Sequence, residues 1–117
     1  MIYVIKTKSE IGVVTEQNSR GVDKLFLANL ADFPERNPKV KLFSLASLKP
    51  GEEVEYHIHE GESESYYIIS GRAFYNDNGV EMEIQPGTVT YTPSGTGHGI
   101  KNAGNEMLEF IALIILD

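Results

Sequence analysis

The chain contains no cysteine, and this absence excludes disulfide bonds, thiolate metal ligands and thiol nucleophiles. Basic residues are also scarce, because 10 Lys and Arg stand against 17 Asp and Glu, for a formal net charge of −7. Nucleic acids and anionic membrane surfaces bind basic faces, so this charge balance argues against either kind of partner.

Long apolar segments are missing as well. The longest apolar run, residues 110–116, is much shorter than the roughly 20 residues that a membrane-spanning helix needs. Residues 1–10 lack the apolar core and the small-residue cleavage site of a signal peptide, so we expect no signal peptide. These features favour a cytoplasmic protein.

The sequence has no convincing long helix, whereas strand signals recur along it. Residues 22–31 fit a helical spacing and a strand equally well, and we favour a strand because their surroundings are β-like. Short strands separated by turn residues are typical of an all-β sandwich or barrel, and the length indicates one domain spanning residues 1–117. The strands that we predict are 1–5, 11–15, 22–31, 40–48, 54–59, 64–70, 72–75, 80–85, 88–92, 98–102 and 107–116.

The most informative segment carries His57 and His59, which are separated by one residue. Since alternate side chains of a strand share a face, the two imidazoles point the same way and could bind one divalent metal ion. Glu64 follows after a gap long enough for a turn and the start of a partner strand, so its carboxylate could reach the same ion. The remaining histidine, His98, also lies in a predicted strand, which makes all three histidines candidates for one site.

Two blocks of residues with fixed spacings extend this pattern. Residues 51–71 read G(x)5HxH(x)4E(x)6G, and residues 87–102 read G(x)5PxG(x)2H(x)3N. The pair closely resembles the two signature motifs of the cupin superfamily, and its short spacer is similar to that of small microbial single-domain cupins. The resemblance implies a double-stranded β-helix, the cupin jelly-roll barrel, with a metal ion inside it.

The resemblance also implies that His57, His59, Glu64 and His98 are the metal ligands. Imidazole nitrogens suit Zn, Fe, Ni, Co and Mn, and a carboxylate shifts the preference toward the harder Mn and Fe(II). We therefore expect one divalent transition metal from this set as cofactor, with Mn or Fe favoured.

Less specific interpretations of the same residues remain open. A cupin barrel can keep its fold and lose its metal, although this chain has all four ligand residues. Glu60 or Glu62 could replace Glu64 as a ligand, but neither has the spacing of the family. We expect most of the other acidic residues near the first motif to form a solvated rim. They are Glu52, Glu53, Glu55, Glu60 and Glu62.

Most tyrosines are expected to pack in the barrel rather than to act as acids. Alternation from Glu64 points Tyr66 and Ile68 into the cavity, so Tyr66 is the tyrosine most able to contact a ligand. We expect Asn102 to be structural and to hold the turn after the last ligand strand. The tyrosines concerned are Tyr56, Tyr66, Tyr67, Tyr75 and Tyr91.

Fold and metal do not fix the reaction. The first hypothesis is a small dioxygenase or oxidoreductase that acts on a small organic substrate bound to the metal, with Glu64 and Tyr66 as candidate catalytic residues. The alternatives are a metal-dependent isomerase or lyase and a non-catalytic small-molecule binding or sensor protein. A sugar-phosphate substrate is disfavoured, because the acidic rim would repel a dianion of that kind.

The predicted last strand, residues 107–116, is apolar on both faces. A barrel strand buries one face in its own core, so the other face, with Ile111, Leu113 and Ile115, needs a cover. We predict that a second copy of the chain supplies it in a homodimer, to which the predicted strand 1–5 could contribute.

Overall fold

The computed structural model describes residues 4–17, 23–31 and 33–117, and their strands form two antiparallel sheets. The larger sheet contains β1 (Val13–Gln17), β2 (Asp23–Asn29), β3 (Val40–Leu48), β5 (Glu62–Ser70), β8 (Val89–Thr92) and β10 (Leu108–Leu116). The smaller sheet contains β4 (Glu53–Ile58), β6 (Ala73–Asp77), β7 (Val80–Ile84) and β9 (Gly97–Asn102).

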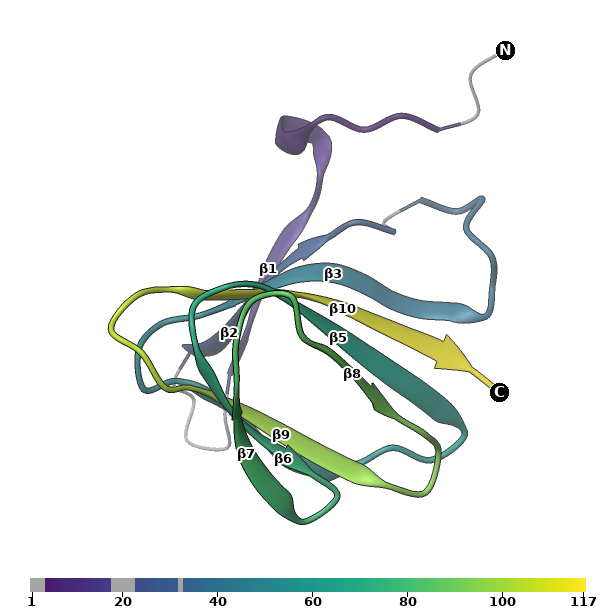
Figure 1. Ribbon diagram of the computed structural model, residues 1–117. Coiled ribbons are helices and arrows are strands. Elements are labelled where there is room, and N and C mark those ends of the chain that lie inside the picture. Colours follow the sequence, from purple (N-terminus) through teal and green to yellow (C-terminus); the bar gives the residue numbers. More distant parts are fainter. Residues whose placement is uncertain (1–3, 18–22, 32) are drawn as a thin grey trace.

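The strand order is β1-β2-β3-β10-β5-β8 in the larger sheet and β4-β9-β6-β7 in the smaller one. Figure 1 shows the two sheets facing each other, with β10 and β5 above β9 and β6. Strands adjacent in the chain therefore often lie in different sheets, as a double-stranded β-helix requires. This arrangement confirms the predicted all-β class and the barrel fold.

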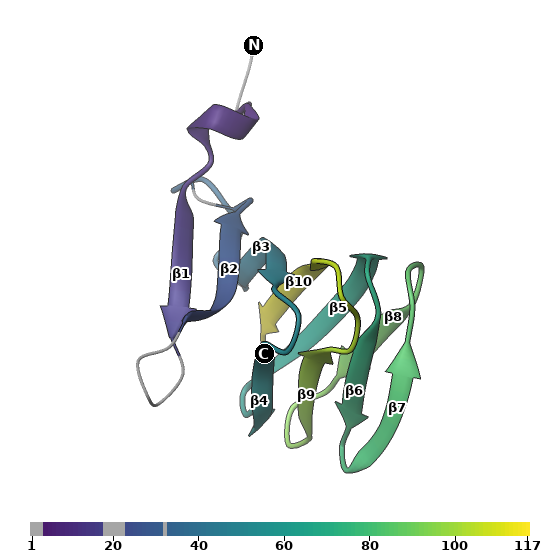
Figure 2. The same cartoon turned by 90° about the vertical axis from the view of Figure 1, so that its left-hand side faces the viewer.

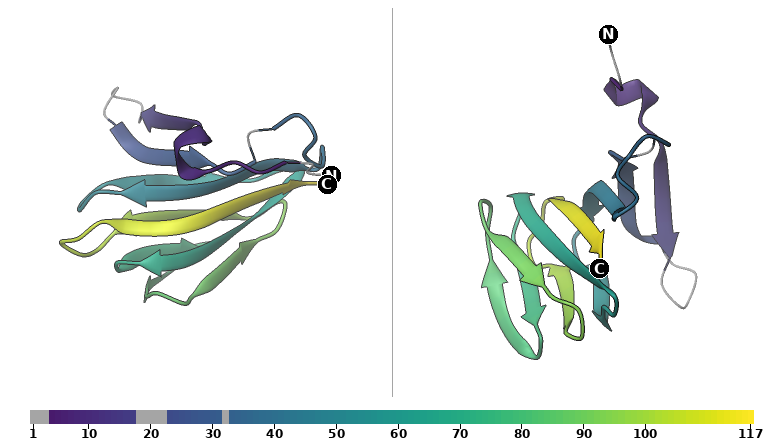
Figure 3. Two further views of the ribbon diagram at one scale, coloured as in Figure 1. Left: turned by 90° about the horizontal axis from the view of Figure 1, so that it is seen from above. Right: turned by 90° about the vertical axis from the view of Figure 1, so that its right-hand side faces the viewer.

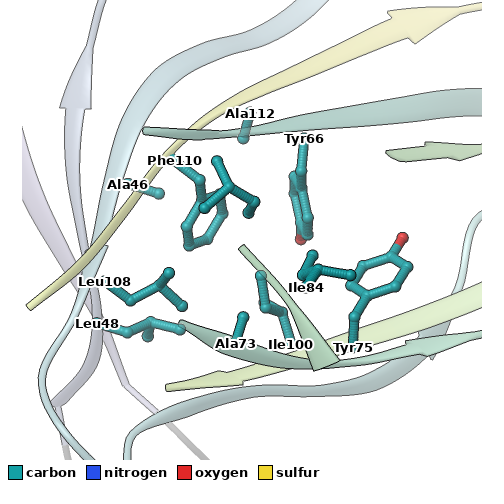
Figure 4. Close-up of a cluster of buried hydrophobic side chains, with 11 residues drawn as sticks. Ala46, Leu48, Tyr66, Ala73, Tyr75, Ile84, Ile100, Leu108, Phe110 and Ala112 are labelled. Atoms are coloured by element: carbon teal, nitrogen blue, oxygen red, sulfur yellow. The ribbon is translucent and has the colours of Figure 1, made fainter. Parts of the chain in front are cut away.

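The inward faces of the two sheets share one apolar core (Figure 4). Strand alternation selects its members: on β10, Leu108, Phe110 and Ala112 are buried while the residues between them are partly exposed. The core consists of Ala46, Leu48, Tyr66, Ile68, Ala73, Tyr75, Ile84, Ile100, Leu108, Phe110 and Ala112.

Strand register places several buried polar residues, among them Glu64 and His98, at one end of this core. Along β10, Phe110 pairs with Ile68, and four residues later Ile114 pairs with Glu64. On β9 of the facing sheet, His98 is buried at the same end. We call the end that holds Phe110 and Ile68 the apolar end of the barrel, and the end that holds Glu64 and His98 the polar end.

Asn102 closes the apolar end, as the sequence predicts. Its Nδ2 donates to the carbonyl of Leu48 at 2.8 Å and to that of Glu106 at 2.7 Å, while its Oδ1 accepts from the N–H of Gly104 at 2.9 Å. The side chain is buried, so these bonds tie the end of β9 to the end of β3 and to the turn before β10.

The N-terminal part of the chain departs from the sequence prediction. Residues 1–3 of the predicted strand 1–5 lie outside the described residues, and Val4 and Ile5 are not in a strand, so the prediction is wrong there. A 3-10 helix, η1 (Lys8–Glu10), follows instead. The strand favoured for residues 22–31 is confirmed as β2.

The β1–β2 hairpin extends the larger sheet beyond β3. Figures 2 and 3 show it alongside β3, to one side of the two facing sheets. The smaller sheet does not extend under the hairpin, so the shared interior of the barrel lies between the remaining strands. In the part of the chain that the structure describes, no helix is long and apolar enough to span a membrane.

Candidate metal centre

Four side chains converge at the polar end of the barrel. His57, His59, Glu64 and His98 each offer one ligand atom, and these atoms all lie within 4.8 Å of one another. His57 is partly buried, and the other three residues are buried. The structure thus brings all four sequence-predicted ligand residues into a single cluster that could hold a metal ion.

His57 and His98 lie directly opposite each other in the ladder between β4 and β9. A bulge in β4 between Val54 and His57 changes the register just before this pair. Gly99 permits the close approach, because a Cβ there would lie 3.0 to 3.2 Å from backbone atoms of Tyr56 and Val54. The glycine-rich segment before and within β9 therefore helps to bring the two imidazoles together.

His59 lies just beyond β4 and is held by the loop that leads into β9. Its N–H donates to the carbonyl of Thr96 at 3.1 Å, and its carbonyl accepts from the N–H of Gly95 at 2.7 Å. Gly95 has a φ of +87°, a conformation that favours glycine. These bonds fix the backbone of His59 relative to His98.

Glu64 reaches the cluster from the opposite sheet. In register it lies between Thr92 of β8 and Ile114 of β10. The expectation that its strand pairs with the histidine strand is wrong, because β4 pairs with β9 and the chain crosses to the larger sheet before β5. The carboxylate therefore meets the imidazoles across the barrel interior and not along a hairpin.

The separations between ligand atoms suit a shared ion. The Nε2 of His59 lies 3.0 Å from the Nε2 of His57, 3.1 Å from the Nε2 of His98 and 2.9 Å from the Oε1 of Glu64. The Nε2 of His98 is also 2.9 Å from that oxygen. Two ligands at right angles on bonds of about 2.1 Å are about 3.0 Å apart, so these atoms fit around one metal ion.

The outer ring nitrogens strengthen this fit. A backbone carbonyl can only accept, so His57 carries its proton on Nδ1, and an ionised carboxylate imposes the same tautomer on His59. Their Nε2 lone pairs then point inward beside the carboxylate of Glu64, and such a group of electron-rich atoms calls for a cation. The Nδ1 contacts are His57 to the carbonyl of Glu55 at 2.7 Å, His59 to Oε2 of Glu62 at 2.7 Å, and His98 to Oη of Tyr75 at 3.0 Å.

Two tyrosines of the apolar core, Tyr66 and Tyr75 (Figure 4), also contact the cluster. The ring of Tyr66 stacks on His98, with centroids 4.8 Å apart and an interplanar angle of 23°. The hydroxyl of Tyr75 contacts His98, and burial raises the pKa of Tyr75, which keeps that hydroxyl protonated. Sequence reasoning missed the role of Tyr75, because nothing in the spacing showed that β6 pairs with β9.

The packing prediction is right for these two tyrosines and wrong for the other three. Tyr56, Tyr67 and Tyr91 are 46%, 50% and 62% exposed. Tyr67 and Tyr91 lie on the outward face of the larger sheet, where the strand alternation places them. Tyr56 lies beside the bulge of β4 and covers Gly97.

The solvated-rim prediction is wrong for Glu62, which is only 8% exposed. Strand β5 begins at Glu62 and not at Glu64, so both carboxylates face inward. A hydrogen bond from Lys41 lowers the pKa of Glu62, and burial lowers the pKa of His57. Glu62 is therefore held as a carboxylate and His57 as a neutral imidazole over a wider pH range than the free side chains.

Comparison with known proteins agrees with the fold described above. Residues 44–114 match the family model described as "Cupin domain". The oxalate-binding protein of Thermotoga maritima is 40% identical over 97% of this chain and 94% of its own length. The oxalate decarboxylase OxdC of Bacillus subtilis is 32% identical over 77% of this chain, but the match spans only 24% of the length of OxdC.

A solved structure extends the likeness to the whole fold. The crystal structure of a predicted oxalate decarboxylase from Thermotoga maritima is 40% identical and superposes with a TM-score of 0.87. The match covers 97% of this chain and 100% of that one.

Proposed function

Because the chain belongs to the cupin domain family, we propose that its three histidines and Glu64 bind one divalent transition metal ion and that the loaded site binds oxalate or a similar small dicarboxylate. The observation that carries the proposal is the convergence of inward-facing Nε2 atoms on the Glu64 carboxylate. The relative that is named for oxalate binding supports the choice of ligand. An ion such as Mn(II) or Fe(II) would supply positive charge and further coordination positions for ligand oxygens.

The charge of the ligand set favours a small anion. Three neutral imidazoles and one carboxylate neutralise only one of the two charges of a divalent ion, so the loaded site would keep a net positive charge. The chain around it is acidic overall, with a net charge of −7, which disfavours large polyanions. Ile114 pairs with Glu64, and Leu42 pairs with Ile114 on the next strand, so apolar side chains lie next to the cluster. A small dicarboxylate can place its oxygens directly on the ion, whereas a sugar phosphate would also bring its phosphate against the acidic surroundings.

The described residues support binding of the ligand more directly than its chemical conversion. General acid–base catalysis would need a side chain placed to exchange a proton with the bound ligand. Among the residues that the structure describes, Glu62 is the further carboxylate in contact with the cluster, and its two oxygens already contact Lys41 and His59. Both oxygens of this carboxylate are therefore already occupied by contacts that stabilise the cluster.

The test begins with elemental analysis of protein purified without chelator, followed by calorimetric titration of Mn(II)-loaded protein with oxalate, malonate, succinate and formate. We expect about one metal ion per chain, tight binding of oxalate and weak binding of formate. Glu64→Gln should keep metal with reduced affinity, whereas Glu81→Gln on the outside of β7 should behave as the native chain. Absence of metal, or loaded protein that does not bind oxalate, would contradict the proposal.

The dioxygenase hypothesis remains a prediction that the same protein can test. Mn(II)- and Fe(II)-loaded samples would be incubated with oxalate, catechols, 1,3-diketones and flavonols under air and under nitrogen. Oxygen-dependent loss of a substrate would favour the dioxygenase, with Glu64 and Tyr66 as catalytic candidates. Equal conversion under nitrogen would favour a lyase or isomerase, and binding without conversion would favour a binding protein.

We also propose that the chain forms a homodimer through the outer face of the larger sheet. On that face Ile111 of β10 pairs with Leu45 of β3 on one side and with Tyr67 of β5 on the other. Leu113 pairs with Phe43, which is 38% exposed. The apolar residues form a continuous patch across three strands, and a second copy would cover it.

Light scattering at micromolar concentration tests the dimer. Leu113→Glu places a charge in this patch and should yield monomer or aggregate. Val80→Glu, on the exposed part of β7 in the other sheet, is the matched control and should leave the mass unchanged. A monomeric native chain would contradict the proposal. The cytoplasmic location expected from the sequence likewise remains a prediction, which fractionation of the source cells would test.

A further inference from the structure

We propose that Glu62, supported by Lys41, is a positioning residue that fixes the ring and the tautomer of His59; this inference rests on the proposed metal site. Lys41 Nζ donates to Oε1 of Glu62 at 2.7 Å, and Nδ1 of His59 donates to Oε2 at 2.7 Å. Each carboxylate oxygen thus has its own partner. We call the three residues the Lys41–Glu62–His59 relay.

The relay joins three separate segments of the barrel. Lys41 lies on β3, Glu62 begins β5 and His59 follows β4 of the other sheet. The Glu62 side chain is 11% exposed and that of His59 is 8% exposed, although the lysine side chain is 55% exposed. An ion pair with a largely buried carboxylate resists solvent screening better than a pair between two exposed groups. The relay therefore holds His59 from the side opposite to the metal cluster.

The three candidate ligand histidines differ in what holds their outer nitrogen. His57 is held by a backbone carbonyl, and His98 contacts a tyrosine hydroxyl that can donate or accept. Among the three outer nitrogens, that of His59 is the one in contact with a carboxylate, and this carboxylate also accepts a hydrogen bond from a lysine. An ionised carboxylate can only accept, so Glu62 favours a proton on Nδ1 of His59 in competition with Glu64, whose Oε1 lies 2.9 Å from Nε2. With the proton on Nδ1, Nε2 is a stronger donor to a metal ion.

The substitution Glu62→Gln exposes this role because an amide cannot satisfy both partners. If its oxygen accepts from His59, its NH2 group faces the ammonium of Lys41, and two donors meet. If the amide turns over, the NH2 group faces Nδ1 of His59, which must then accept and carry its proton on Nε2. We expect the second arrangement, which turns a proton toward the metal cluster.

The first readout is the His59 tautomer in metal-free protein, measured by long-range 1H–15N NMR. The native chain should carry the proton on Nδ1, and Glu62→Gln should shift it toward Nε2. The second readout is metal affinity by calorimetric titration with Mn(II), where Glu62→Gln should bind about 10- to 100-fold more weakly. Glu60→Gln changes the same charge in the exposed turn and should alter neither readout.

Combination with Lys41→Met separates positioning from simple loss of charge. Without the ammonium, the amide oxygen of Gln can accept from His59 while its NH2 group faces solvent. The double variant should therefore regain the native tautomer and bind Mn(II) more tightly than Glu62→Gln alone. Lys41→Met by itself retains the carboxylate and should lower the affinity less than Glu62→Gln does.

The possible outcomes distinguish failure of the relay from failure of the proposed metal site. A native-like tautomer in Glu62→Gln, or a double variant weaker than both single variants, would overturn the relay. If the native chain bound no metal, the proposed function would fail, whereas the tautomer in metal-free protein would still decide whether Glu62 positions His59. If Glu62→Gln did not fold, the native chain would still decide, because a metal-free native chain without a proton on Nδ1 of His59 would contradict the positioning role of Glu62.

Discussion

The two ends of the barrel are built on the same strands but contain different chemistry. At the apolar end, Phe110 and Ile68 are buried almost completely among other hydrocarbon side chains. At the polar end, the same strands β10 and β5 contribute Ile114 and Glu64, and the facing β9 contributes His98. One end therefore resembles an ordinary protein core, while the other concentrates charge and lone pairs that hydrocarbon packing cannot stabilise.

This difference indicates that folding stability and metal binding depend on opposite ends of the strands. Burial of apolar area favours folding regardless of ligand, so the apolar end should stabilise the metal-free chain. Converging lone pairs at the polar end do not favour folding by themselves, and their cost is offset once a cation binds. Substitutions at the two ends should thus separate folding stability from metal binding.

The largest effect on folding is expected for Phe110→Ala. The side chain is 1% exposed and contacts Tyr66, so its removal leaves a cavity at the apolar end. A loss of about 3–5 kcal/mol in the free energy of unfolding is expected for such a change. Urea denaturation of metal-free protein measures it, with Phe74→Ala as the control, because Phe74 is 54% exposed on β6. Equal losses in both variants would contradict the assignment of the core.

His59→Ala should have the opposite effect, with loss of metal binding rather than of folding stability. It removes the imidazole whose Nε2 is closest to the other three ligand atoms, so stoichiometric metal binding should be lost. At 100 times the dissociation constant, Mn(II) should stabilise the native chain by about 2.7 kcal/mol, and the variant not at all. Denaturation with and without metal, together with elemental analysis, checks both. A variant that keeps a full equivalent of metal would contradict the ligand assignment.

Much of this fold could be predicted from the sequence, because alternation and turn residues are local signals. The strand around His57, the strand at 40–48 and the structural role of Asn102 all follow from neighbouring residues. The pairing of β4 with β9 does not, since it joins residues some forty positions apart and depends on where the chain changes sheet. Spacing alone indicated a hairpin partner for the histidine strand, and that was wrong.

The candidate site shows the same limit. The four candidate ligand residues could be found because their types and spacings resemble a family pattern. Glu62 and Tyr75, which contact the Nδ1 atoms of His59 and His98, could not be found that way. Their roles depend on the inward register of β5 and on the β6–β9 ladder, which are tertiary features that a single sequence does not show.

The pH dependence of metal-free stability gives a smaller effect at the polar end. Burial lowers the pKa of His57 in the folded chain, so the unfolded chain binds the proton first as the pH falls. The stability contributed by a neutral His57 should be present above about 6.5, the value for a free imidazole, and be lost as the pH falls through the folded value. Glu62 acts in the same direction at lower pH, because Lys41 lowers its pKa from 4.5.

Urea midpoints measured from pH 8 to pH 5 test this sign. The native chain should lose stability over this range, and His57→Gln, which cannot take up a proton, should lose less. The same protonation competes with metal, so the affinity for Mn(II) should also fall as the pH is lowered. Stability that rises on acidification over this range would contradict the buried, neutral state of His57.

The smallest effects are expected where the two ends meet, at Tyr66 and Tyr75. Tyr66→Phe keeps the ring that stacks on His98 and packs on Phe110, with centroids 4.8 and 4.7 Å away, so stability should change by no more than about 1 kcal/mol. Its affinity for Mn(II) should stay within a few-fold of the native value. Tyr75→Phe also keeps a core ring but removes the hydroxyl next to Nδ1 of His98.

Tyr75→Phe should therefore weaken metal binding more than Tyr66→Phe does, although both remove one oxygen from a buried ring. Calorimetric titration with Mn(II) measures this order directly. A reversed order would mean that the stacking tyrosine, and not the tyrosine in contact with Nδ1, orients His98. If Tyr66→Phe abolished conversion of a substrate while keeping full metal affinity, its hydroxyl would act on the substrate, as the sequence predicts for a catalytic Tyr66, and the boundary between the two ends would be part of the active site.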